Sequence, residues 1–144
     1  MRRATESSTT GDAILAILLV VAGACTTSHA PAPARQVVET FSHLYFELAR
    51  PADAQTLASG AVAEALEEEV ALLVGVPRPE APVATAAVVK DELFDGGALV
   101  KFTVEVRSLP DSGSSRGSTP LLVNMDLFVR EVDGTWKVVD WARQ

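Results

Sequence analysis

The chain of 144 residues contains one cysteine, Cys25, and only two histidines, His29 and His43. A single thiol cannot form a disulfide within the chain, so packing must stabilise the folded part. One cysteine and two separated histidines also lack the clustered spacing of a metal site. The sequence therefore predicts no metal centre and no cofactor.

Basic residues are also in the minority, with 12 Lys and Arg against 19 Asp and Glu, which gives a net charge of -7. An acidic protein is repelled by phosphate backbones and by anionic lipid head groups. Nucleic acid is therefore excluded as an expected partner.

The chain has little hydrophobic sequence of membrane-spanning length. The apolar run at residues 13–24 is too short to cross a bilayer core of about 30 Å, but it fits the apolar region of an export signal. It follows Arg2 and Arg3 and ends at Cys25. Two alternatives stay open: an ordinary secretory signal beside a coincidental cysteine, and an uncleaved anchor helix.

The segment Ala22-Gly23-Ala24-Cys25 resembles the lipobox of bacterial lipoprotein signals. The resemblance implies cleavage before Cys25, a diacylglyceryl group on its thiol and frequent acylation of the new amino terminus. Residues 1–24 are then a signal peptide, and residues 25–34 are the lipidated cysteine and a proline-containing tether. The protein is expected to be exported and anchored on the extracytoplasmic side of a membrane through Cys25.

Residues 35–144 are enough for one domain with a hydrophobic core. Apolar residues recur at helical spacing first, and an alternating pattern follows. The expected helices are residues 35–50, 52–58 and 61–74. The expected strands are residues 83–94, 98–107, a long strand through 121–129, and 135–141 after the Asp133-Gly134 turn.

Helices followed by an antiparallel meander with one apolar face predict an α+β domain, with its helices on one face of a bent sheet. The opening helix Phe-Ser-His-Leu-Tyr-Phe-Glu-Leu at 41–48, the break at 51–53 and the final hairpin at 129–138 resemble the NTF2-like superfamily. Similar small domains occur in bacterial lipoproteins and Mce-associated proteins. The resemblance implies a cone with a pocket between helices and sheet, but it implies no particular activity.

No catalytic residue is predicted. The segment Gly113-Ser114-Ser115-Arg116-Gly117 matches a hydrolase pattern, but it lies between two strands and both histidines precede it. His43 falls on the solvent side of its helix. In steroid isomerases of the resembled superfamily, a tyrosine on the first helix donates a hydrogen bond to the substrate. Tyr45 matches that position, although a core role with its hydroxyl at the rim is favoured.

A two-residue turn at Asp133-Gly134 would pair Leu127 with Asp140 on the inner face of the sheet. Asp140 would then lie beneath the helices, where Tyr45 is its candidate donor. The alternative is a bulge near residue 139 that turns Asp140 outward and Trp141 inward. Glu69 either faces the pocket or reaches water at its boundary. The candidate pocket residues are Phe41, Tyr45, Leu66, Glu69, Met125, Leu127 and Asp140.

The same register places Phe128, Val139 and Trp141 on the outer face of the sheet. Large apolar groups on that face suggest a contact surface for a homodimer or for an envelope protein. The alternative is that the tether or the chain end covers them.

The sequence thus predicts a lipid-anchored extracytoplasmic domain that binds a small apolar ligand or a protein partner without catalysis. Two rival functions are a small pocket enzyme of the isomerase or dehydratase type and a purely structural subunit of an envelope complex.

Overall fold

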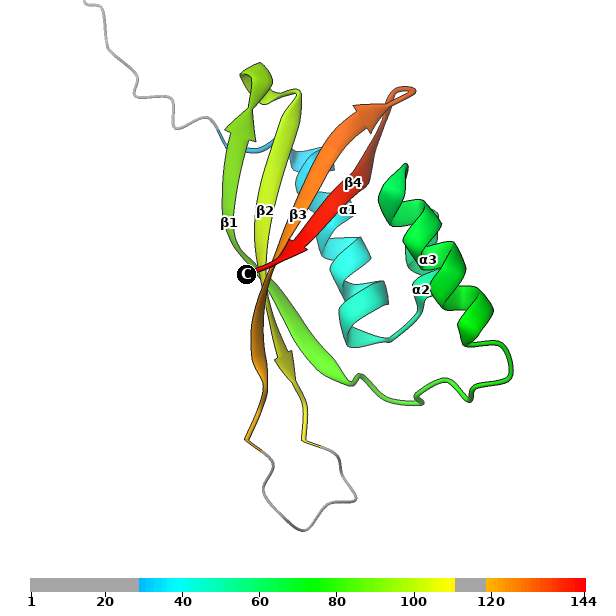
Figure 1. Cartoon of the computed structure of the whole chain (residues 1–144). Coiled ribbons are helices and arrows are strands. Elements are labelled where there is room, and N and C mark those ends of the chain that lie inside the picture. The colour runs from blue at the N-terminus through cyan, green and yellow to red at the C-terminus, as the bar shows by residue number, and fades with distance from the viewer. Residues whose placement is uncertain (1–28, 111–118) are drawn as a thin grey trace, which may run out of the picture.

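The structure is a computed structural model that describes residues 29–110 and 119–144. Cys25, the expected signal and the Gly113–Gly117 motif lie outside the described residues. Helices pack against a four-stranded antiparallel sheet, which is an α+β fold (Figure 1). Among the described residues, no helix is long and apolar enough to cross a membrane.

The first helix, α1 (Ala32–Ser42), continues directly into a π-helical turn, η1 (His43–Glu47). Ala34, Val38 and Phe41 follow helical spacing, and all three are fully buried. The helix begins three residues before its expected start, within the expected tether. Pro33 permits this because a proline in the first turn has no hydrogen bond to lose.

Two further helices follow: α2 (Pro51–Gln55) and α3 (Ala61–Leu72). α2 is shorter than expected, and α3 ends two residues earlier than expected. Val62 and Leu66 form the buried stripe of α3. The residues that follow α3, 73–80, are all exposed.

The sheet runs in the order β1-β2-β3-β4. Its strands are β1 (Ala84–Phe94), β2 (Leu99–Ser108), β3 (Leu122–Val132) and β4 (Thr135–Arg143), and the short turn η2 (Asp95–Gly97) joins the first two. Asp133 and Gly134 both have positive φ, as a two-residue turn of type I′ requires. The predicted final hairpin is therefore confirmed.

The core lies between α1 and the inner face of the sheet, and α1 contacts all four strands. The largest fully buried side chains come from two helices, α1 and α3, and from β2, β3 and β4: Val38, Phe41, Val62, Leu66, Val100, Phe102, Val104, Leu127, Val129 and Val138. Burial of this apolar surface supplies the main favourable free energy of folding.

Two irregularities bend the sheet. The register of β1 against β2 shifts between Val88 and Lys90, and the register of β4 against β3 shifts opposite Phe128 and Val129. In each case one extra residue, Val89 or Val139, has no partner. Such bulges increase local twist and re-aim the side chains beyond them.

The free edge of β4 is partly covered by the segment before α3. Val138 donates its backbone N–H to the Leu57 carbonyl, and the Val138 carbonyl accepts from the Ser59 N–H, both at 2.9 Å. Lys137 adds a bond from Nζ to the Thr56 carbonyl at 2.6 Å. These bonds hold the start of α3 beside the sheet.

Replacing Leu66 with Ala should lower the free energy of unfolding by about 2–5 kcal/mol, because Leu66 is fully buried and the loss leaves a cavity. Leu72→Ala, six residues along the same helix, is the matched control, since Leu72 is 82% exposed. It should change the free energy by no more than about 0.5 kcal/mol. Urea denaturation measures both values, and equal effects would contradict the described packing of α3.

Candidate functional site

A cluster of aromatic rings fills the space between the end of the first helix and β4. Tyr45 lies 5.1 Å from Phe46 and 5.6 Å from Phe41 between ring centroids. Trp141 completes the cluster at 5.3 Å from Tyr45 and 6.2 Å from Phe41. These are the separations of favourable aromatic pairs. The π-helical turn η1 carries both Tyr45 and Phe46.

The bulge at Val139 brings Trp141 into this cluster. Beyond the bulge, Trp141 pairs with Leu127 and Asp140 pairs with Phe128. The prediction that Asp140 pairs with Leu127 on the inner face is therefore wrong, and the alternative with a bulge near residue 139 is confirmed. Burying an indole is favourable, whereas burying an unpaired carboxylate costs on the order of several kcal/mol. This difference favours the register in which Trp141, and not Asp140, lies on the inner face.

Asp140 is exposed on the outer face, where its carboxylate accepts a hydrogen bond from the Trp141 backbone N–H at 2.8 Å. It does not meet Tyr45. The expected Tyr45–Asp140 pair is thus wrong, and so is the placement of Trp141 on the outer face.

Tyr45 instead donates its hydroxyl proton to Glu69 Oε2 at 2.9 Å. Glu69 lies on α3 and is half-buried, so it faces the interior side of that helix. The bond links α3 to the first helix across the aromatic cluster. Burial raises the pKa of Tyr45 well above its usual value near 10, and the hydrogen bond and negative charge of Glu69 raise it further.

The candidate interior pocket is occupied by the protein's own side chains. Phe41, Leu66 and Leu127 are fully buried, and all three belong to the core. Met125 is half-buried and borders a cavity of about 210 Å³, together with Phe46, Val106, Val123 and Arg143. The structure thus brings Phe41, Tyr45, Leu66, Leu127 and Glu69 together, but as packed partners.

A larger groove lies at the end of α3 and was not predicted. Its volume is about 480 Å³, and it is lined by residues 49–52, Val70 and residues 73–79. Most of these side chains are apolar, and Arg50 and Arg78 are the charged ones. This groove, called the α3-end groove below, lies between the segment entering α2 and the segment leaving α3.

One sequence signal pointed toward the α3-end groove. The run Val70-Ala71-Leu72-Leu73-Val74 is apolar at five successive positions, and a helix cannot bury all of them on one side. Leu72 and Val74 are indeed exposed, at 82% and 81%. An excess of apolar residues at the end of a helix is therefore the sequence pattern that indicates the α3-end groove.

The outer face of the sheet is mainly charged. Glu92 forms ion pairs with Lys90 at 2.8 Å and with Lys101. These two ammonium groups, Lys101 first, lower the pKa of Glu92 to about 2. Phe128 is half-buried on this face, whereas Val139 is the unpaired residue of the bulge and Trp141 lies on the inner face, so the expected apolar contact surface is smaller than predicted.

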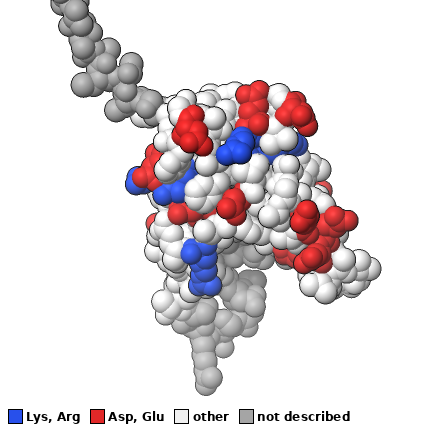
Figure 2. All heavy atoms as spheres, turned by 45° about the horizontal axis from the view of Figure 1, so that its top comes forward, with Lys and Arg blue, Asp and Glu red and all other residues white. Residues whose placement is uncertain are grey.

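Charges of both signs are interspersed on the face seen in Figure 2, whereas acidic side chains gather toward the side where α3 lies. α3 carries Glu64, Glu67, Glu68 and Glu69 without a basic residue. The α3-end groove therefore has an acidic helix as its neighbour.

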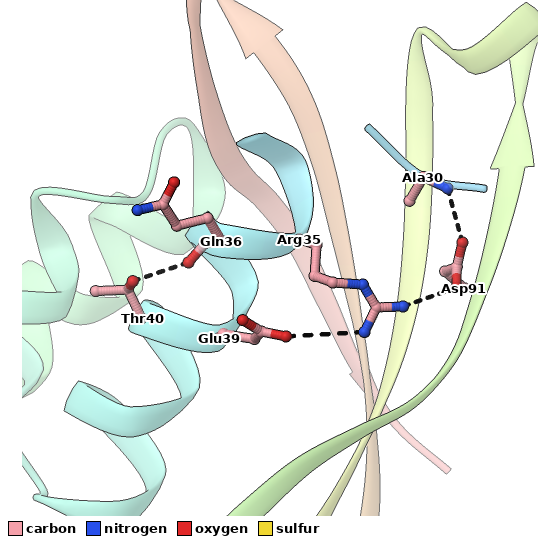
Figure 3. A network of polar contacts seen from close by, with 6 residues as sticks. All are labelled: Ala30, Arg35, Gln36, Glu39, Thr40 and Asp91. Atoms are coloured by element: carbon pink, nitrogen blue, oxygen red, sulfur yellow. Dashed lines mark hydrogen bonds and ion pairs between the residues drawn. The ribbon is translucent and has the colours of Figure 1, made fainter. Parts of the chain in front are cut away.

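A polar network fixes the chain where it enters the domain (Figure 3). Asp91 accepts the Ala30 backbone N–H at 2.9 Å and the Arg35 guanidinium at 3.1 Å. The bulge at Val89 turns Asp91 to the inner face, where it pairs in register with Phe102. The Arg35 guanidinium lies 5.8 Å from the centre of the Phe102 ring. The start of α1 is thereby held against β1.

His43 is exposed, as predicted, and its Nδ1 lies 2.6 Å from Glu47 Oε2. Glu47 Oε1 accepts the backbone N–H of Ala86 at 2.7 Å, so this carboxylate ties η1 to β1. In the described parts of the chain, no three His, Cys, Asp or Glu side chains gather as a metal site requires.

Comparison of the chain with protein families, with curated proteins and with solved structures finds no match.

Tyr45 is the only tyrosine of the chain, so tyrosinate absorbance reports on it alone. In the folded protein Tyr45 should stay protonated to well above pH 10, and Glu69→Gln should lower its pKa by removing the negative charge. Since the unfolded chain releases this proton near pH 10, the free energy of unfolding should fall as pH rises above 10. Ionisation of Tyr45 near pH 10 in the folded protein would contradict the Tyr45–Glu69 hydrogen bond.

Proposed function

We propose that this protein is an exported, lipid-anchored domain of NTF2-like architecture that binds a small apolar ligand and does not catalyse a reaction. Support for the architecture comes from element order. One long helix crosses all four strands of a bent antiparallel sheet, and two shorter helices follow it. The sequence motifs at 41–48 and 129–138 lie in the first helix and in the final hairpin, where the superfamily has them.

The α3-end groove is the observation that carries the binding function. Its volume of about 480 Å³ lies in the usual range of about 300–1,000 Å³ for small-molecule sites. Val74 and Val76 line it and are 81% and 53% exposed. An apolar ligand would remove their apolar surface from water, which is favourable.

The absence of catalysis is proposed from the packing of the interior. A pocket enzyme of the isomerase or dehydratase type would need Tyr45 to meet a substrate. Its hydroxyl is hydrogen-bonded to Glu69, and its ring packs against Phe41, Phe46 and Trp141. The same filled interior favours the second candidate, a structural subunit of an envelope complex.

Lipid attachment at Cys25 gives the anchoring prediction. Replacing Cys25 with Ser should prevent lipid transfer, because the acceptor is the thiol. The mature lipoprotein should partition into detergent, since each buried methylene contributes about 0.8 kcal/mol. Intact mass and detergent phase separation check this. A Cys25→Ser variant that is cleaved and partitions as the parent does would refute lipidation.

Binding in the α3-end groove can be tested with the neutral dye N-phenyl-1-naphthylamine, which fluoresces in apolar sites. The full chain, held in an amphipathic polymer in place of lipid, should bind the dye. Val74→Glu should weaken binding by about tenfold or more, since a carboxylate would have to be buried against the ligand.

Leu72→Glu is the matched control, because Leu72 is as exposed as Val74 but does not line the groove. It adds the same charge to the same end of α3 and should leave dye binding unchanged. Equal binding by the parent, Val74→Glu and Leu72→Glu proteins would reject the groove as a ligand site and favour the structural subunit.

A further inference from the structure

We infer that the α3-end groove selects a single-chain lipid with a carboxylate head, that is, a fatty acid whose head meets Arg50 and Arg78. This inference rests on the proposed function, since it names the ligand class of the same groove.

The two arginines supply the only charges among the residues that line the groove. Among the ion pairs of residues 29–110 and 119–144, none involves Arg50 or Arg78. A guanidinium binds a carboxylate through two parallel hydrogen bonds, which makes it the side chain best suited to such a head group.

The backbone at both arginines is restrained. Arg50 donates its N–H to the Leu44 carbonyl at 2.8 Å, and its own carbonyl accepts the Ala54 N–H at 3.1 Å. Arg78 lies between Pro77 and Pro79, whose rings restrict the backbone on both sides. Restraint before binding reduces the conformational entropy that binding must overcome.

The apolar lining fits one hydrocarbon tail. Val70, Leu73, Val74 and Val76 line the groove from both sides of Gly75. The left-handed conformation of Gly75, with φ of 81°, turns the chain back at this point. Apolar walls beside two cationic groups complement an amphiphile with an anionic head.

The charge around the groove favours a carboxylate over a phosphate head. Glu67 and Glu68 lie on the exposed face of α3, and Glu80 follows the lining segment. A monoanion is repelled less by these acidic groups than a phosphate of nearly two charges. The same acidity disfavours a second copy of this chain as the occupant, since each copy has a net charge of -7.

The experiment uses a 12-carbon fatty acid that carries a photoreactive group in its tail, with the full chain in the amphipathic polymer. Irradiation should label the peptides that contain residues 49–52 and 70–79. Dodecanoate should compete with the label at least about tenfold better than 1-dodecanol, which has the same tail and no charge. Dodecyl phosphate should compete less well than dodecanoate.

Arg50→Gln with Arg78→Gln should abolish the advantage of dodecanoate over 1-dodecanol and leave 1-dodecanol competition within about twofold of the parent's. Arg130→Gln is the matched control, because Arg130 is exposed on the outer face of the sheet. It should keep the full advantage of dodecanoate.

Three results would overturn the inference. Equal competition by dodecanoate and 1-dodecanol would remove the head-group preference while leaving apolar binding intact, and the neutral dye would then still bind. Stronger competition by dodecyl phosphate would identify a phosphate-headed ligand. Labelling outside the groove, with a protein that self-associates through α3, would identify a second copy as the occupant.

Discussion

One extra residue in β4 governs how the interior is filled. Without the bulge at Val139, strict alternation would place Asp140 under the helices and Trp141 in water. The bulge reverses both, and the indole then completes the cluster around Tyr45. A carboxylate in that position would have needed a partner or a solvent-filled space. An aromatic ring needs neither, so the centre of the domain is packed.

Because side chains fill the centre of the domain, the groove of about 480 Å³ lies at its periphery. Tyr45 donates a hydrogen bond to Glu69, which links α3, packed on α2 and β4, to η1. α3 contributes Val62 and Leu66 to the core over its first half, whereas its last two residues and the segment that follows them are exposed. The α3-end groove lies where this exposed end meets the segment that leads into α2. A packed core and a peripheral groove are therefore two results of the same arrangement.

The fold class and most elements followed from periodicity and turn chemistry. Apolar stripes located α1 and α3, and Asp133-Gly134 located the final hairpin. Periodicity did not locate the bulge, because the alternation shifts by one residue beyond Val139 and too few residues follow to show the new phase. The choice at Val139 depended on the relative cost of burying Asp140 or Trp141, and the sequence alone left both registers open.

Candidate site residues were only partly predictable for the same reason. Tyr45 and Glu69 were both selected from their positions on helices, but their pairing depends on how α3 packs against α2 and β4, which sets its place relative to η1. The α3-end groove comes largely from a segment without secondary structure, residues 73–79, where neither helical nor strand spacing applies. The one feature of the sequence that indicated this groove was the apolar run at residues 70–74, which is longer than the buried stripe of a helix requires.

The bond network at Asp91 has a geometrical consequence for a lipid-anchored protein. Ala30 is held against β1, so only five peptide steps separate this fixed point from Cys25, a reach of at most about 18 Å. Ala30 lies beside the beginning of α1, whereas the groove begins just after η1, at the other end of the same helical rod (Figure 1). With the lipid on Cys25, as proposed, this short connection keeps the start of α1 close to the bilayer surface. The lipid anchor and the proposed ligand site would then lie at opposite ends of the same helical rod.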